Sequence, residues 1–151
     1  NLRSRKRMTK IVSIVSKIPI KTYWPLHDGT IYYLKKYGLL NILKDNKNIV
    51  LSGLVSYSKF TNMLVHSKIL LVDGGSIQEE SLIFKKPCLL LRMKTERQEG
   101  FKTGINFLTE LNMEKTKKII DYILDKNFKI PDIENPYGGK GASKKVADIL
   151  F

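Results

Sequence analysis

The segment of residues 72–80, VDGGSIQEE, most constrains what this chain can fold into. The apolar run 68–72 before it has the length of a strand, and the pattern after it predicts a helix over 77–84. Between them, Gly74 and Gly75 carry no Cβ, so a ligand can approach the backbone closely. A strand, a glycine turn and a helix place backbone N–H groups at a helix N-terminus, where they attract phosphate. A plain strand-to-helix turn has the same pattern, so both interpretations stay open.

The start of the predicted helix carries two further signals. Ser76 and Glu79 have the spacing of an S-x-x-E capping box, which predicts Ser76 as the N-cap. Glu80 lies one turn into the helix, where a carboxylate can accept hydrogen bonds from two hydroxyl groups, as it does from ribose in nucleotide sites. A solvated helix glutamate is the alternative.

Apolar runs of strand length alternate with helical patterns along the chain. Strands are predicted at 20–24, 48–51, 68–72, 88–92 and 104–108, and helices at 3–17, 31–37, 56–66, 77–84, 113–124 and 142–151, with a short helix or turn at 39–45. This alternation predicts an α/β fold with a parallel sheet covered by helices on both faces. Ligands of such sheets bind outside the carboxyl ends of the strands, which predicts a site among His27, 52–56, 73–76 and 92–100.

Several other ionisable side chains have both a functional and a structural interpretation. Arg97, between Glu96 and Glu99, can clamp a phosphate with two hydrogen bonds or form a surface ion pair. His27 can act as an acid or base near neutral pH or be purely structural. The single Cys88 lies in an apolar run and is predicted as a buried core thiol. No residues have metal-ligand spacing, so neither a metal nor a cofactor is predicted.

The net charge of +13 is compatible with several anionic partners or with a solvated lysine-rich surface. No basic stripe is interleaved with aromatic residues, and no zinc or RNA-binding motif is present, so nucleic acid is not an expected partner. No apolar run reaches the roughly 18 residues of a membrane span, so we expect no membrane contact and a cytoplasmic location. The first residue is Asn1 rather than Met, which indicates a piece of a longer protein or a processed one.

Several motifs together resemble one known family. Asp73 to Glu80 is followed by Lys86-Pro87, by the run 92–100 with Thr95-Glu-Arg97, and by Asn135-Pro-Tyr-Gly138 ahead of Ala142-Ser143. In this order and spacing they resemble the C-terminal half of the non-hydrolysing UDP-N-acetylglucosamine 2-epimerases. The resemblance implies that residues 1–151 are the UDP-binding, Rossmann-like C-terminal domain of a two-domain enzyme of the GT-B arrangement.

The resemblance also implies roles for individual residues. Phe60 matches the family residue near the uracil, and Glu80 matches the carboxylate that binds the ribose hydroxyls. Gly74, Gly75 and Ser76 match the turn that holds the diphosphate, although the order here is GGS where the family has SGG. Arg97 matches the arginine near the phosphates.

The family reaction interconverts UDP-GlcNAc and UDP-ManNAc by elimination and re-addition of UDP. Its acid and base carboxylates belong to the N-terminal domain, so we expect that domain as a missing partner and no catalytic residue in this chain, with His27 the only candidate. We further expect a homodimer of the full-length protein and no activity of the chain alone. The alternatives are the nucleotide-sugar half of a GT-B glycosyltransferase and a basic, non-catalytic binding module.

Overall fold

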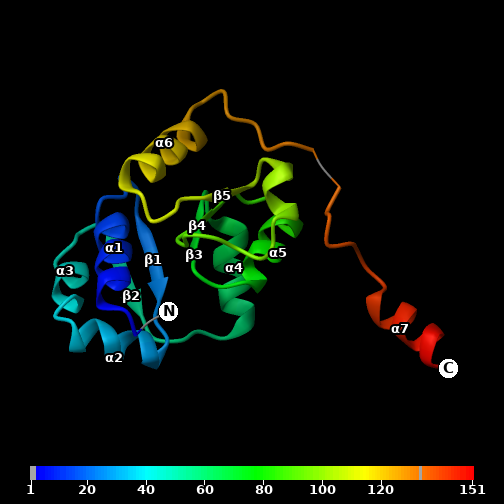
Figure 1. Cartoon of the computed structure of the whole chain (residues 1–151), viewed down its shortest axis with the longest axis horizontal. Helices are drawn as coiled ribbons and strands as arrows, with labels where there is room; N and C mark the ends of the chain where they lie inside the picture. The colour runs from blue at the N-terminus through cyan, green and yellow to red at the C-terminus, as the bar shows by residue number, and fades with distance from the viewer. Residues whose placement is uncertain (1–2, 133) are drawn as a thin grey trace.

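Helices and short strands alternate along the computed structural model, which describes residues 3–132 and 134–151 (Figure 1). In chain order the elements are α1 (Arg5–Ser16), β1 (Thr22–Pro25), α2 (Asp28–Lys36), α3 (Leu40–Lys44), β2 (Ile49–Ser52), α4 (Tyr57–His66), β3 (Leu70–Val72), α5 (Ser76–Ile83), β4 (Cys88–Leu90), the 3-10 helix η1 (Glu99–Thr103), β5 (Asn106–Leu108), α6 (Met113–Leu124) and α7 (Ala142–Leu150). Within the described ranges, every helix is too short or too polar to cross a membrane.

All strand pairs in the described part of the chain are parallel, as predicted. β1 pairs with β2, while β4 lies between β3 and β5, with Cys88 opposite Leu70 on one side and Asn106 on the other. Strand pairing therefore forms two sheets, of order β1-β2 and β3-β4-β5, where a single sheet was expected. Packing joins them, because Trp24 of β1 and Leu71 of β3 contact the same apolar cluster.

The sheet β3-β4-β5 carries helices on both faces. One face of the sheet carries alternate side chains of β3 and β4 and Leu108 of β5 (Leu70, Val72, Cys88, Leu90, Leu108). They pack against side chains of α4, of α5 and of the residue that ends α5 (Phe60, Leu64, Ile77, Phe84). The intervening residues Leu89 and Phe107 pack with Ile120 and Ile123 of α6. The two-residue period of the strands thus separates the two layers, and the predicted covering of both faces is confirmed for this sheet.

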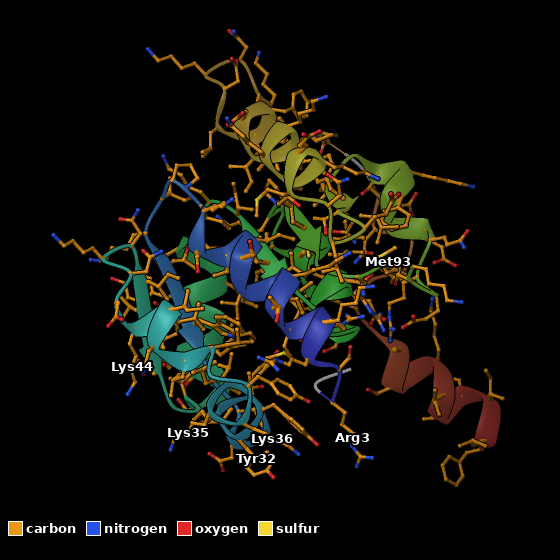
Figure 2. The ribbon with its side chains drawn as sticks, turned by 60° about the vertical axis from the view of Figure 1, so that its left-hand side comes forward. Arg3, Tyr32, Lys35, Lys36, Lys44 and Met93 are labelled. Atoms are coloured by element: carbon orange, nitrogen blue, oxygen red, sulfur yellow. The ribbon has the colours of Figure 1, made fainter. Side chains whose placement is uncertain are left out.

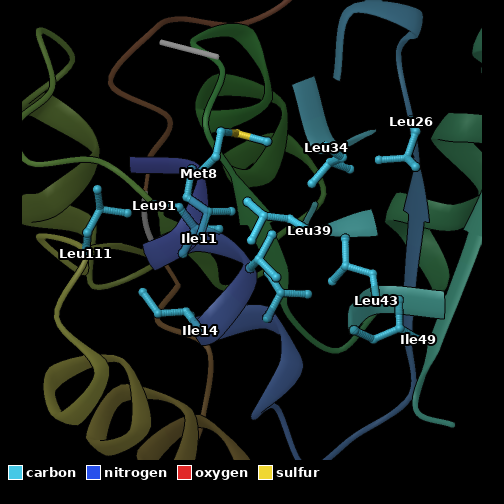
Figure 3. Packing of buried hydrophobic residues seen from close by; sticks show 12 residues of the cluster. Met8, Ile11, Ile14, Leu26, Leu34, Leu39, Leu43, Ile49, Leu91 and Leu111 are labelled. Carbon is cyan, nitrogen blue, oxygen red and sulfur yellow. The ribbon is translucent and has the colours of Figure 1, made fainter. Parts of the chain in front are cut away.

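A second core fills the space between α1, α2, α3 and the β1-β2 sheet. Met8, Ile11 and Ile14 recur at helical spacing on α1 and are buried with Leu34 of α2 and Leu43 of α3 (Figure 3). Leu91, just after β4, joins the same cluster, so the ends of the two sheets share a core.

The last helix, α7, lies apart from the rest of the described chain (Figure 1). None of its residues is buried, and Val146, Ile149 and Leu150 are 55%, 83% and 69% exposed. The helix forms where the periodicity predicted it, but its apolar side chains cover no part of the two sheets.

Candidate functional site

The glycine turn joins β3 to α5 as predicted, but the helix begins one residue earlier than the capping box required. Gly75 is the N-cap, Ser76 is the first helical residue, and no side chain in the described ranges caps the helix by a hydrogen bond. The predicted Ser76–Glu79 capping box is therefore wrong. In a capping box the glutamate occupies the third helical position, whereas in a helix that starts at Ser76 that position belongs to Gln78 and Glu79 follows it. The amide end of α5 keeps its partial positive charge at the carboxyl edge of the sheet.

Arg97 lies directly against this turn. A Cβ added to Gly75 would stand 2.5 Å from one terminal nitrogen of the Arg97 guanidinium, so the arginine occupies the space that glycine leaves. Arg97 Nε donates to Glu79 Oε1 at 2.5 Å, and a terminal nitrogen donates to Glu96 Oε1 at 2.8 Å. The hydrogen bond to Glu79 raises the pKa of Arg97, so the guanidinium is charged at every physiological pH.

Glu80 has an unsatisfied carboxylate in the first turns of α5. Its Oε2 atom is buried and has no hydrogen-bond partner among the described residues, although the residue as a whole is only half-buried. A buried carboxylate oxygen is costly to leave unpaired. Because protein atoms cover this oxygen, a hydroxyl donor from outside the chain reaches it only when the Glu80 side chain turns outward.

Phe60 lies in the first half of α4 and is half-buried. It packs, with Ile77 of α5, against the apolar cluster on one face of β3-β4-β5. The fold thus brings five of the six predicted binding residues to the glycine turn or α5 (Gly74, Gly75, Ser76, Glu80, Arg97), and it places Phe60 on the neighbouring helix.

The sequence did not single out Arg7, which reaches this edge from α1. It pairs with Asp73 at the start of the turn and donates to the Leu91 carbonyl at 3.1 Å, while Arg92 Nε lies 3.8 Å from the same Asp73 oxygen. Arg7 stands four residues before the buried Ile11, on the apolar face of α1. A lone charged residue on that apolar face was the signal in the sequence that could have indicated a role for Arg7.

Gln78 was also missed, as was its partner Thr95. Both are buried, at 0% and 8% exposure, and Thr95 donates its hydroxyl to Gln78 Oε1 at 3.1 Å. A glutamine in the first turn of a helix usually faces solvent, so complete burial was not predictable from its type.

The remaining candidates have structural contacts. His27, named as the only catalytic candidate, is the N-cap of α2, and its Nδ1 accepts from the Gly29 N–H at 3.2 Å. Cys88 is fully buried at the start of β4, as predicted, and burial raises the pKa of its thiol to about 12. A thiol in that state is a poor nucleophile. Among the described residues, no group of three or more His, Cys, Asp or Glu side chains can hold a metal ion.

The basic surface lies elsewhere. Lys35, Lys36 and Lys44 project from α2 and α3 (Figure 2). Lys36 Nζ stands 5.9 Å from the centre of the Tyr32 ring. Part of the net charge is therefore an exposed lysine surface on α2 and α3.

Taken together, the edge of β3-β4-β5 offers a charged guanidinium, a helix N-terminus and an unpaired carboxylate oxygen. The first two stabilise an anion such as a phosphate group. The third accepts a hydrogen bond from a hydroxyl group. This combination suits a ligand that carries both phosphate and sugar.

Comparison with known proteins agrees with this geometry. Curated relatives include the UDP-N-acetylglucosamine 2-epimerases of Methanocaldococcus jannaschii, 33% identical over 99% of this chain, and of Methanococcus maripaludis, 30% identical over 97%. The chain spans only 41% and 39% of these two proteins.

Solved structures give the same result. The UDP-GlcNAc 2-epimerase of M. jannaschii in complex with UDP-GlcNAc and UDP superposes with a TM-score of 0.90, at 32% identity over 99% of this chain and 42% of that one. The Neisseria meningitidis enzyme bound to UDP-GlcNAc gives 0.79, at 29% identity over 97% of this chain and 40% of that one. The fold is thus a Rossmann-like α/β unit, which matches part of enzymes that have the GT-B-type fold. The family model for UDP-N-acetylglucosamine 2-epimerase matches residues 1–151, and the chain belongs to that family.

Proposed function

We propose that residues 1–151 are the UDP-binding C-terminal domain of a UDP-N-acetylglucosamine 2-epimerase. In this proposal, a separate N-terminal domain supplies the acid and base carboxylates, and the complete enzyme interconverts UDP-GlcNAc and UDP-ManNAc. The chain spans 41% of the M. jannaschii relative, which leaves room for such a domain in a protein of that length.

One observation carries the proposal: the Arg97 guanidinium packs on Gly75 at the N-terminus of α5. A diphosphate at this point meets a helix amide end and a charged arginine together. Glu79 and Glu96 hold Arg97 there through hydrogen bonds of 2.5 and 2.8 Å, so its position is prepared before a ligand arrives.

The other predicted contacts follow from the same placement. Glu80 accepts the ribose hydroxyls through its carboxylate, whose unpaired Oε2 turns out of its buried position to meet them, and Gly74, Gly75 and Ser76 offer backbone N–H groups to the diphosphate. Phe60, on α4 beside the start of α5, packs near the uracil.

These residues also suit the chemistry of the proposed reaction. When the bond from the sugar to the diphosphate breaks, negative charge builds on the departing UDP. Arg97 and the amide end of α5 stabilise that charge, and they lower the barrier to the extent that they bind the departing group better than the intact substrate. No proton transfer is assigned to this chain, because the proposal places the acid and base carboxylates on the N-terminal domain.

The test is calorimetric titration of the chain with UDP and, separately, with pyrophosphate. Arg97→Gln is expected to weaken both ligands about tenfold, because it removes charge-assisted hydrogen bonds to phosphate. Glu80→Gln is expected to weaken UDP alone, because pyrophosphate has no ribose. Arg5→Gln and Glu114→Gln are the matched controls, since both side chains are exposed and neither makes an ion pair or hydrogen bond in the described part of the chain.

Equal loss of both ligands in Glu80→Gln would contradict the ribose contact. Binding that is indifferent to Arg97→Gln but falls steeply with salt and with Lys35→Gln would favour the exposed lysine surface of a basic binding module. The homodimer, the cytoplasmic location and the absence of nucleic-acid partners are further predictions for the parent protein.

A further inference from the structure

We infer that Gln78 is a positioning residue that couples the glycine turn to the arginine loop, residues 92–97, so that the two halves of the phosphate site keep a fixed spacing. The inference rests on the proposed function and deepens it. Gln78 is completely buried, so it acts through Gly74 and Arg97 and not on a ligand directly.

A continuous chain of hydrogen bonds links the two segments through the Gln78 side chain. Gln78 Nε2 donates to the Gly74 carbonyl at 3.0 Å, which ties α5 back to the turn that precedes it. Gln78 Oε1 accepts from the Thr95 hydroxyl at 3.1 Å. Thr95 Oγ1 in turn accepts from the Arg97 backbone N–H at 3.3 Å.

The bonding partners permit one orientation of the Gln78 amide. The Gly74 carbonyl can only accept, so the NH2 group must face it. The opposite end then presents an oxygen to Thr95, whose proton is available because its own oxygen already accepts from Arg97. A flipped amide would set two oxygens against each other at Gly74.

Burial makes this chain of bonds stiff. Gln78 is 0% and Thr95 8% exposed, so water cannot easily replace either contact. The Gln78 backbone is held as well, because its carbonyl accepts from Ser81 Oγ at 2.8 Å and from Asn106 Nδ2 at 3.1 Å. The glutamine is therefore anchored to β5 on one side and joins both ligand-facing segments on the other.

This arrangement matters because Arg97 and Gly75 must act on one phosphate group. A shift of the arginine loop relative to the turn would separate the guanidinium from the helix amides. Small misplacements of this kind cost binding and rate well beyond their effect on stability.

The experiment compares Thr95→Val, Gln78→Met and the double variant in the 151-residue chain. Thr116→Val is the matched control, since Thr116 is 2% exposed and its hydroxyl bonds the Asn112 carbonyl within α6, away from the turn. Two quantities are measured: UDP affinity, and the NMR resonance of the Gly75 amide, which shares a peptide unit with the Gly74 carbonyl. Melting temperature is recorded for each variant.

We expect Thr95→Val to shift the Gly75 amide resonance and to weaken UDP about tenfold. Thr116→Val should lower the melting temperature by a similar amount and change neither quantity. In the Gln78→Met background, Thr95→Val should add no further effect. The double variant distinguishes two routes by which the Thr95 substitution could affect the Gly75 amide. One route runs through the Gln78 side chain, and the other runs through Arg97, which also lies against Gly75.

The inference is overturned if Thr95→Val disturbs only residues 92–97, or if the two substitutions have additive effects in the double variant. Should the unaltered chain bind no UDP, the proposed function of the isolated chain fails. The Gly75 resonance still decides the coupling in that case.

Discussion

The carboxyl edges of the two sheets carry polar side chains of similar kinds but use them differently. At the β1-β2 edge, His27 accepts from Gly29, two positions away, and Ser52 Oγ donates to the adjacent Gly53 carbonyl. At the β3-β4-β5 edge, Asp73 pairs with Arg7, 66 positions away, and Arg97 donates to Glu79, 18 positions away. These contacts of the first edge are local, whereas the second edge adds contacts between distant segments to its local ones.

The difference distinguishes a structural edge from a candidate site. Local hydrogen bonds form in short peptides and say little about a ligand. Contacts between distant segments require loop closure and side-chain ordering, whose entropy other interactions must offset. The sequence already placed most of the predicted binding residues after the strand at 68–72, and the separation of the bonded residues independently ranks the β3-β4-β5 edge first.

The largest expected effect comes from removing the contact with the greatest sequence separation, which joins Arg7 to Asp73. Arg7→Met should lower the free energy of unfolding by about 2 kcal/mol, because it leaves Asp73 with only the more distant Arg92. Urea denaturation measures this, with Arg5→Met on the exposed side of α1 as control. Equal stability of the two variants would mean that the long-range pair contributes nothing.

A smaller effect is expected from adding one methyl group at the turn. Gly75→Ala should weaken UDP about tenfold, or about 1.4 kcal/mol, because its Cβ displaces the Arg97 guanidinium. Stability should hardly change, since the clash is with the end of a flexible side chain. Gly53→Ala at the other edge meets no atom within 4 Å and should leave UDP affinity unchanged. Equal losses in both variants would remove the distinction between the edges.

The smallest effect is expected at the locally bonded edge. His27→Ala should cost about 1 kcal/mol of stability through loss of the α2 N-cap and leave UDP affinity as it was. His27→Asn should restore the stability, because asparagine is a good N-cap. A loss of UDP affinity in both His27 variants, with the fold intact, would bring this edge into the site.

Much of the local structure was predictable from residue order. The helix at 113–124 was predicted with the observed bounds, because its apolar residues recur at helical spacing and Asn112 caps it. The capping box failed because its spacing suited a helix capped by Ser76, whereas the chain uses Gly75. A shift of one residue in a helix start is beyond what a motif can specify.

The site was predictable in part for the same reason. The glycine turn and Glu80 lie close together in sequence, and Arg97 was matched by its motif. The roles of Arg7 and Gln78 were not predicted, because their hydrogen-bond partners, Asp73 and Thr95, lie 66 and 17 positions away. No local pattern reports which distant residue will face a buried amide.

Helices α6 and α7 show which properties the sequence determines and which the tertiary structure determines. The sequence determined that α6 and α7 are both amphipathic helices, since side-chain spacing sets periodicity without reference to the rest of the chain. Only the tertiary structure decided that Ile120 and Ile123 of α6 are buried against the sheet while Ile149 of α7 stays 83% exposed. Burial needs a complementary surface brought to the same place, and that surface is made by segments far away in the sequence.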